Sequence, residues 1–402
     1  MNTLVIDGGT LITPEVVIKG GRVVIGEGTI VAVGALGATD FPAVAEVIRA
    51  DGLYVCPGFI DLQMNGAAGF DVLDGTEEAL TAIARFNISH ATTSFLPTLI
   101  SSPIEKMTAV VKHVRNLQRK SVSGSKILGV HLEGPYISPA QIGAHDPRYV
   151  RLPAREEVET LLDYSDIIRV ITAAPEVPDV IDMCREFVHR GTVASIGHSN
   201  ATYDEVLAAV DSGFTMVTHI YSVMSSMMRV GPRKVAGVLE AALLLDELSV
   251  GVIGDGFHVP EPFMKLVLKA KGTGKAILVT DAIRATGLTD GKYVLGTNED
   301  ERFALVENGV AMTPDRTLYA GSVTTMDVCV RNAVSLGGIE LKDAVAMATI
   351  NPAKLLHMEN EVGSLEQGKK ADLVILDREL KPVYTIINGE VVFKRGCTQS
   401  PV

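Results

Sequence analysis

Cysteine pairs, long apolar runs and a leader-like start are all missing from this sequence. The 402 residues contain four cysteines, and none has a CxxC spacing. Neither a disulfide framework nor a cysteine zinc site is therefore expected. No stretch approaches the ~18 uninterrupted apolar residues that a membrane span requires. The N-terminus, MNTLVIDGGTLITPE, lacks a basic region and reaches Asp7 and Gly8 too early for a secretory signal. These absences predict a soluble cytoplasmic protein.

Positive charge is in the minority. Lysine and arginine number 36 against 48 aspartates and glutamates, which gives a net charge of −12 at pH 7. Such an acidic chain has little attraction for a phosphate backbone, so nucleic-acid binding is disfavoured. A hydrophobic fraction of 47% with 21% charged residues is ordinary for a folded protein and excludes a disordered chain. The length favours two domains, or one large α/β barrel with an appendage.

Both ends of the chain consist of short apolar runs separated by glycine. Val23–Ile25 and Ile30–Val33 have the β-branched content of strands. Near the other end, Asn388–Gly389 lies between two apolar runs, which is a strong hairpin signal because both turn residues must adopt positive φ. We therefore predict one β domain formed by residues 1–55 and 359–402. The alternative is two unrelated hairpins that flank the middle of the chain.

Residues 56–358 alternate apolar strand-like runs with helical stretches. A helix is predicted over Thr202–Asp211, where Thr202 and Glu205 have capping-box spacing and Gly213 ends the helix. Continuous apolar strands indicate a parallel sheet that is buried on both faces. Roughly eight such units in ~300 residues fit a (β/α)₈ barrel. A doubly wound sheet is the alternative, but the expected GxGxxG after its first strand is absent.

Acidic and histidine side chains follow the strand candidates at their carboxyl ends. In an α/β barrel these ends converge on one mouth, where catalytic groups lie. Two histidines and one glutamate from separate strands favour a metal site, since His₂Glu is a catalytic zinc set that leaves one position for water. The residues in this setting are Glu133 after ILGVHL, His198 after TVASIG, His219 after FTMVT, His258 after VGVIGDGF and Asp281 after AILVT.

Each of these residues also has a purely structural interpretation. A lone histidine at a strand end is more often a hydrogen-bonded core residue than a ligand. Asp281 could be the N-cap of a following helix, a position that favours aspartate. His131 shares a strand face with Glu133, and it could either orient that ligand or simply fill the barrel interior.

The ordered set of motifs HLEGPYISP, GAHDP, GHSNAT, THIY, DGFH, VTDA, YAGS and NPAK resembles the N-acetylglucosamine-6-phosphate deacetylases of the amidohydrolase superfamily. The resemblance runs over nearly the whole chain, through GSLEQGKKADLVILD. It implies a (β/α)₈ barrel over residues 56–358 and a small β-sandwich formed from both termini. It also implies a homodimer.

The same resemblance implies roles for individual residues. A divalent metal, zinc before iron, manganese or cobalt, would bind Glu133, His198 and His219. Asp281 would be the catalytic acid/base, and it would take a proton from water and return it to the departing nitrogen. His145 and His258 would contact the sugar and its acetamide. The remaining positions implied to line the substrate site are Ala144, Asp255, Tyr319, Ala320 and Gly321.

Two departures from the family pattern bear on these roles. Many amidohydrolases have His-x-His on the first strand, where this chain has Gln63 and Asn65; because amides are poor ligands for zinc, we expect a single metal. On the phosphate side, Ser222 and Val223 replace Asn-Ala. Val230 stands where the family has an arginine, so Arg229, one position earlier, is the predicted phosphate ligand, ahead of Arg233.

Three functions are therefore weighed. The first is metal-dependent hydrolysis of the acetamide of an N-acetylhexosamine 6-phosphate, with N-acetylglucosamine 6-phosphate as the leading substrate. The second is hydrolysis of another N-acyl compound, such as N-acetylgalactosamine 6-phosphate or an unphosphorylated sugar, which the altered phosphate loop favours. The third is a catalytically silent sugar-binding protein, and retention of the four metal and acid/base positions argues against it.

Overall fold

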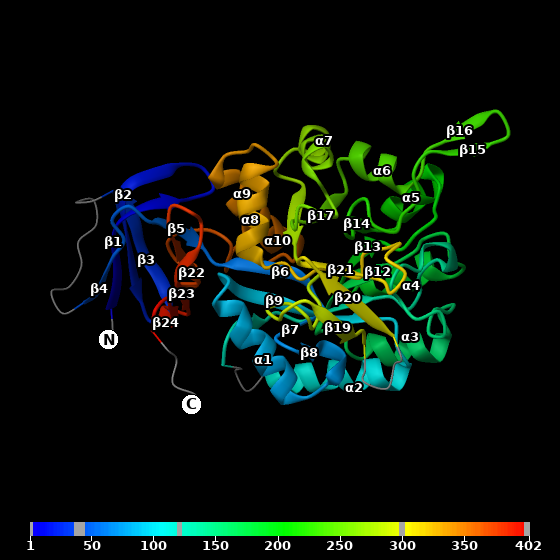
Figure 1. The fold of residues 1–402 in the computed structure, drawn as a ribbon, viewed down its shortest axis with the longest axis horizontal. Helices are drawn as coiled ribbons and strands as arrows, with labels where there is room; N and C mark the ends of the chain where they lie inside the picture. The colour runs from blue at the N-terminus through cyan, green and yellow to red at the C-terminus, as the bar shows by residue number, and fades with distance from the viewer. Residues whose placement is uncertain (1–2, 36–44, 119–122, 297–301, 398–402) are drawn as a thin grey trace.

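The computed structural model of the chain describes residues 3–35, 45–118, 123–296 and 302–397. These residues form a barrel of parallel strands surrounded by helices and, beside it, a separate β-sheet region (Figure 1). No described helix is long and apolar enough to cross a membrane.

Eight parallel strands form the barrel. Neighbouring strands pair in the order β6, β9, β11, β12, β13, β14, β17 and β18. The backbone N–H of Asp281 donates to the carbonyl of Gln63 at 2.9 Å and so joins the last strand to the first. The predicted (β/α)₈ barrel is confirmed, and the doubly wound alternative is wrong. The strands span β6 Phe59–Met64, β9 Thr92–Ile100, β11 Val130–Glu133, β12 Ile168–Ala173, β13 Val193–Ile196, β14 Phe214–Val217, β17 Ser249–Ile253 and β18 Ala276–Val279; β10, Lys126–Ile127, also pairs with β9.

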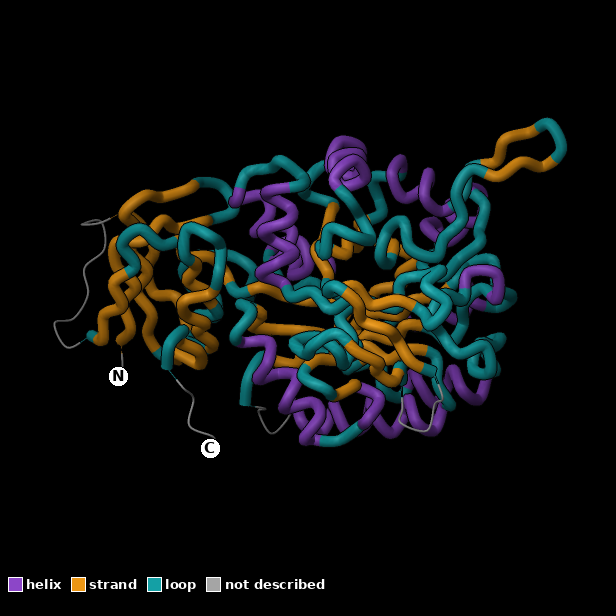
Figure 2. Tube along the Cα trace, viewed as in Figure 1, coloured by secondary structure: helices purple, strands orange, loops and turns teal. Residues whose placement is uncertain are grey.

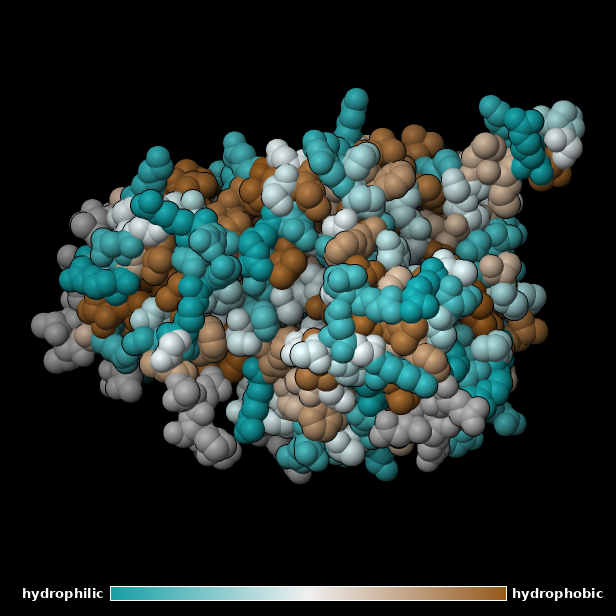
Figure 3. All heavy atoms as spheres, viewed as in Figure 1, coloured by the Kyte–Doolittle hydropathy of each residue, from teal (hydrophilic) through white to brown (hydrophobic). Residues whose placement is uncertain are grey.

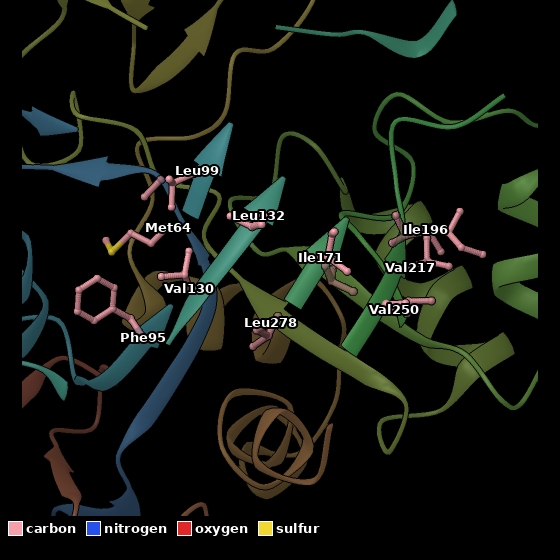
Figure 4. Close-up of a cluster of buried hydrophobic side chains, with 14 of the residues drawn as sticks. Met64, Phe95, Leu99, Val130, Leu132, Ile171, Ile196, Val217, Val250 and Leu278 are labelled. Atoms are coloured by element: carbon pink, nitrogen blue, oxygen red, sulfur yellow. The ribbon is translucent and has the colours of Figure 1, made fainter. Parts of the chain in front are cut away.

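The barrel strands are apolar throughout because both of their faces are buried. On β18, Ile277 and Val279 belong to one buried cluster, and Ala276 and Leu278 belong to the cluster that packs against the helices. Figure 4 shows side chains of the cluster that packs against the helices, on successive barrel strands from Phe95 on β9 to Leu278 on β18. Successive residues of one strand thus point into two different apolar cores, and both sets must be apolar. This explains why the strand sequences are continuous apolar runs.

Ten α-helices are found in the described residues. The predicted capping box starts α5: the Glu205 carboxylate accepts the backbone N–H of Thr202 at 2.7 Å, and the Thr202 hydroxyl accepts from the backbone of Glu205. This helix is confirmed. The helices are α1 Glu77–Ile88, α2 Ile104–Gln118, α3 Arg155–Leu162, α4 Val180–Val188, α5 Tyr203–Asp211, α6 Val238–Leu244, α7 Glu261–Lys271, α8 Met326–Ser335, α9 Leu341–Ala348 and α10 Ile350–Leu355, with short 3₁₀ turns at Val72–Asp74 and Pro139–Gln141.

Strands from both ends of the chain form one sheet, in the order β24-β23-β22-β5-β1-β2-β3, with β4 also paired to β1. The two ends meet where β5 runs antiparallel to β22. The alternative of two unrelated hairpins is therefore wrong. Asn388 and Gly389, with φ of 50° and 77°, make the predicted hairpin turn between β23 and β24. The bounds are β1 Thr3–Ile12, β2 Val17–Gly26, β3 Thr29–Ala35, β4 Glu46–Arg49, β5 Tyr54–Pro57, β22 Leu373–Leu376, β23 Pro382–Ile387 and β24 Glu390–Lys394.

Three further strand groups belong to the loops of the barrel. Strands β19 (Gly291–Val294), β20 (Phe303–Glu307) and β21 (Val310–Met312) form an antiparallel sheet that packs beside the segment after β18. Strands β15 (Met228–Val230) and β16 (Arg233–Val235) form a hairpin that projects from the body of the molecule (Figures 2 and 3). A short pair, β7 (Gly66–Ala67) and β8 (Phe70–Asp71), follows the first barrel strand.

Candidate active site

One cavity of about 530 Å³ collects most of the residues that the sequence singled out. Glu133 is the last residue of β11, and Asp281 comes two residues after the end of β18. The cavity therefore lies at the carboxyl ends of the barrel strands, as expected for this fold. Its lining comprises Asn65, Asp71, Ile100, Glu133, Gly143, Ala144, His145, His198, His219, Tyr221, Ser222, Val223, His258, Asp281, Ile283, Leu295, Gly296, Met312 and residues 316–321.

Glu133, His198 and His219 converge at the base of this cavity. The Glu133 Oε1 atom lies 3.1 Å from Nε2 of His198 and 2.9 Å from Nε2 of His219. The two Nε2 atoms lie 3.2 Å apart, and all three side chains are buried. Among the described residues this is the group of histidine, cysteine and acidic side chains whose ligand atoms all lie within 4.8 Å of one another.

The position of the proton on His198 indicates whether Glu133, His198 and His219 can bind a cation. Its Nδ1 lies 3.0 Å from the backbone carbonyl of Gln141, which can only accept a hydrogen bond, so Nδ1 carries the proton. In the neutral ring Nε2 then carries no hydrogen, and its lone pair faces both the carboxylate of Glu133 and the Nε2 atom of His219. Such an arrangement of lone pairs is repulsive without positive charge between them. The three residues therefore fit a divalent cation, which takes one carboxylate and two neutral imidazoles.

Backbone strain marks the same residues. His198, His219 and Asp281 have φ of 49°, 26° and 49°, values that non-glycine residues rarely adopt. Residues in such conformations persist only where the surrounding structure holds them, and they concentrate at functional sites. Each of the three lies two residues after the end of a barrel strand, and each lines the cavity at the mouth.

The environment of this site shifts the pKa values of its two carboxyl groups, Glu133 and Asp281, in opposite directions. Burial opposes ionisation of Glu133, but when His198 and His219 carry protons in place of a metal, their hydrogen bonds and positive charge hold the pKa of Glu133 well below the usual range. For Asp281, burial and then the charge of Glu133 raise the pKa well above its ordinary value. A cation bound between Glu133 and the histidines would oppose this second shift, because it would offset the charge of Glu133.

Asp281 is held by two amide side chains rather than by a helix. Its Oδ1 accepts hydrogen bonds from Nδ2 of Asn65 at 2.8 Å and from Nε2 of Gln63 at 3.2 Å. Gln63 Nε2 also donates to Glu133 at 3.0 Å, so this amide connects the two carboxylates. No helix follows Asp281 in the described residues up to 296, so the helix-cap interpretation is wrong.

Two further histidines face the cavity in defined tautomers. The backbone N–H of Ser101 donates to Nδ1 of His145 at 3.3 Å, which leaves the proton on Nε2, and burial holds the pKa of His145 well below its usual value. His145 is therefore a neutral hydrogen-bond donor. His258 has its Nδ1 at 2.7 Å from Asp255, and its ring packs against Tyr319 at 4.5 Å between centroids.

His131 belongs to the barrel interior. Its Nδ1 lies 2.9 Å from the carbonyl of Leu62, and its Nε2 lies 2.7 Å from the hydroxyl of Thr172. Burial lowers the pKa of His131 to about 4, so the ring is neutral. Both nitrogens are engaged away from Glu133, which resolves the alternatives in favour of a filled and hydrogen-bonded interior.

The structure brings together most of the predicted site residues at this one cavity. They are Glu133, Ala144, His145, His198, His219, Ser222, Val223, His258, Asp281, Tyr319, Ala320 and Gly321. Two predicted residues do not line it. Asp255 lies behind His258 and orients its ring, and Arg229 lies on the exposed strand β15 of the projecting hairpin.

Other lining residues had not been singled out in the sequence. Arg316, Thr317 and Leu318 come from the turn after β21, and Tyr221 follows His219. The nearest signal for the turn was YAGS, which begins one residue after Leu318. Tyr221 lies within the THIY motif itself.

Comparison with known proteins agrees with this geometry. The Amidohydrolase family profile matches residues 54–392. Human N-acetylglucosamine-6-phosphate deacetylase is 34% identical over 406 residues, covering 99% of this chain and 96% of the relative. The N-acetylgalactosamine-6-phosphate deacetylase of Escherichia coli O157:H7 is 32% identical over 351 residues, covering 87% of this chain and 90% of that protein.

A solved structure extends the similarity to the fold. The crystal structure of N-acetylglucosamine-6-phosphate deacetylase from Pasteurella multocida has a TM-score of 0.90 and 33% identity to this chain, and the match covers 97% of this chain and 99% of the other. The barrel, the buried Glu–His–His group and the similarity along the whole length lead to one conclusion. The chain belongs to the amidohydrolase family, and it is a hydrolase that acts on an amide bond.

Proposed function

We propose that the protein hydrolyses the acetamide of N-acetylglucosamine 6-phosphate to glucosamine 6-phosphate and acetate. The observation that carries the proposal is the convergence of Glu133, His198 and His219 with Asp281 in one cavity. Several relatives at 32–34% identity bear the name of this deacetylase. In the reaction, water adds to the carbonyl carbon, the C–N bond breaks, and a proton from water ends on the sugar nitrogen.

Glu133, His198 and His219 would hold one divalent cation per chain, and zinc is the expected metal. When bound, the metal supplies Lewis acidity, which activates water and polarises the carbonyl. The engagement of Gln63 supports a single metal, because its amide nitrogen already donates to both Glu133 and Asp281. An amide oriented in this way presents hydrogens toward the carboxylates and stabilises their negative charge.

The other residues would position the substrate and move its protons. With Oδ1 of Asp281 occupied by Asn65 and Gln63, Oδ2 is the atom that accepts the water proton and returns it to nitrogen. His145, with its proton on Nε2, would donate to the acetamide oxygen. Asp255 would orient His258 toward the sugar.

The organisation of the protein is part of the proposal. We place one domain at residues 1–55 and 359–402 and the catalytic domain at residues 56–358, because the terminal strands share an apolar core of their own. We further propose a cytoplasmic homodimer, in keeping with the resemblance to the deacetylase family.

A different N-acyl substrate is the second candidate. Ser222 and Val223 line the cavity where the family has Asn-Ala, and a relative of nearly equal identity is named for the galactosamine epimer. An epimer differs only in the direction of one hydroxyl, so a small change in the lining can reverse the preference.

Acetate release from a panel of N-acetylhexosamines tests the proposal. We expect the highest kcat/KM with N-acetylglucosamine 6-phosphate, lower values with the galactosamine and mannosamine 6-phosphates, and poor turnover of the unphosphorylated sugars. A higher kcat/KM with the galactosamine epimer would favour the second candidate. No acetate from any of them in metal-loaded protein would refute both and support a silent sugar-binding protein.

A further inference from the structure

Glu176 contacts the two residues that directly follow His198. It lies in the loop after β12, three residues beyond Ala173, which ends that strand. Its Oε2 atom accepts a hydrogen bond from the hydroxyl of Ser199 at 2.7 Å, and its Oε1 atom accepts one from the backbone N–H of Asn200. Glu176 is not among the described residues that line the cavity, so it can act on the site only through these neighbours.

The backbone of His198 is in a conformation that depends on its surroundings. Its φ is 49°, in the left-handed region. The chain just before it is closely packed, because a Cβ atom at Gly197 would lie 2.6 Å from the side chain of Thr172 and 2.8 Å from that of Thr218. A strained residue persists only where neighbouring contacts hold it. On the carboxyl side of His198, Glu176 supplies two such contacts.

The same hydrogen bonds extend to the imidazole ring of His198. The side-chain amide of Gln141 donates to the side-chain oxygen of Asn200 at 3.1 Å. The backbone carbonyl of Gln141 in turn accepts from Nδ1 of His198 at 3.0 Å. Glu176 holds the backbone of Asn200, Asn200 contacts Gln141, and Gln141 orients the ring. A displacement of Asn200 would therefore change both the backbone and the ring of His198, which together determine where Nε2 lies.

Ser199 has a fixed place for its hydroxyl hydrogen. The residue is fully buried, and its Oγ atom accepts the backbone N–H of Ala201 at 3.1 Å while it donates to Glu176. Its carbonyl accepts the N–H of Ser225, in the loop that follows His219, at 2.9 Å. Loss of the Glu176 carboxylate would leave a buried donor without its acceptor, which is costly, so the loop would have to rearrange.

We infer that Glu176 is a positioning residue for metal binding. It holds Ser199 and Asn200 so that Nε2 of His198 stays beside Glu133 and His219. The inference rests on the proposed function, in which the last three bind a divalent cation. Ligands that folding has already ordered bind more tightly, because binding does not have to order them. Removal of a partner that orients a metal ligand typically weakens metal binding about 10- to 100-fold.

Glu176→Ala is the informative substitution because it removes both contacts. We expect its dissociation constant for Zn²⁺, measured by competition with a chromophoric chelator, to rise about ten- to a hundredfold. With Co²⁺ bound instead, the visible absorption bands should shift, because they depend on the geometry of the ligands. Neither measurement requires turnover. Glu176→Gln keeps an oxygen that can accept the N–H of Asn200, so its dissociation constant should lie between those of the unaltered protein and Glu176→Ala.

Glu205→Ala is the matched control. Glu205 accepts the backbone N–H of Thr202 at 2.7 Å and its hydroxyl at 2.8 Å, the same two kinds of donor that Glu176 accepts. These contacts begin α5, outside the cavity. Glu205→Ala should lower the melting temperature of the metal-free protein and leave the zinc dissociation constant unchanged. If Glu176→Ala does not fold, Ser199→Ala removes one of the two contacts and should raise this constant about tenfold.

The possible failures are distinguishable. If the unaltered protein binds zinc and Glu176→Ala has the same dissociation constant and the same Co²⁺ spectrum, the inference is wrong and the proposed function stands. An equal rise in the dissociation constant of Glu205→Ala would show that metal affinity follows stability alone, which also overturns the inference. If the unaltered protein binds no divalent metal, the metal part of the proposed function fails, and the inference fails with it.

Discussion

Replacement of Asp281 by asparagine separates a role in proton transfer from a role in structure. Oδ1 of Asp281 accepts from Asn65 and Gln63, and the amide oxygen of an asparagine can accept the same two hydrogen bonds. The amide nitrogen would then replace Oδ2, and it cannot take a proton from water. Asp281→Asn should therefore keep the arrangement of the site residues but lose proton transfer.

The expected magnitude follows from the role. A positioned acid/base contributes about 10²–10⁴-fold, which corresponds to about 2.7–5.4 kcal/mol of barrier. We expect kcat to fall by at least a hundredfold, while KM changes little because Asp281 is needed for proton transfer more than for binding. Steady-state acetate release at saturating substrate measures this, and elemental analysis should find the metal still bound.

Stability provides the internal control. The pKa of Asp281 is raised in the folded protein, so stability from this group is lost as pH rises above its unfolded pKa. Asparagine has no such charge, and metal-free Asp281→Asn should unfold at pH 7 at the same temperature as the unaltered protein or higher. A kcat within fivefold of the unaltered enzyme would refute the proton-transfer role. A large drop in melting temperature would show that the carboxylate holds the fold.

Three further outcomes are expected. Protein purified without added metal should contain about one equivalent of divalent metal per chain; two equivalents, both required for activity, would contradict the single-metal proposal. His198→Ala should lose metal and activity together, since its Nε2 is a proposed ligand, and full metal content in this variant would exclude that role. Thr202→Ala removes the capping box of α5 and should reduce the free energy of unfolding by about 1 kcal/mol in urea titrations, without affecting KM. An unchanged unfolding midpoint would mean that water replaces the cap.

The barrel could be predicted because its strands carry a local signal. Runs buried on both faces are continuous in the sequence, and the residue that follows each run lies at the mouth, as Glu133 and Asp281 do. The capping box at Thr202 and the turn at Asn388–Gly389 are also local, since each depends on the conformational preferences of two to four neighbouring residues.

The parts that could not be predicted depend on distant contacts. Arg316 reaches the cavity because the sheet of β19, β20 and β21 packs beside the mouth, and no periodicity in the sequence shows this packing. In the sequence, Gln63 was identified only as a poor metal ligand. In the structure its side-chain amide donates hydrogen bonds to both Glu133 and Asp281. Asp255 was placed in the site by its motif, but side-chain geometry puts it behind His258.

The pairing of β5 with β22 has a consequence for biosynthesis. Cys56 on β5 faces Val374 on β22 across this pair. The ribosome therefore adds about 300 residues after β5 before its partner β22 exists. At about 5–20 residues per second, the ribosome needs about 15–60 s for that distance. During this time β5 presents an unpaired edge to the cell, and such edges readily pair with other chains. A nascent protein stalled within the barrel should therefore be aggregation-prone, and chains truncated before Leu373 should accumulate in insoluble form.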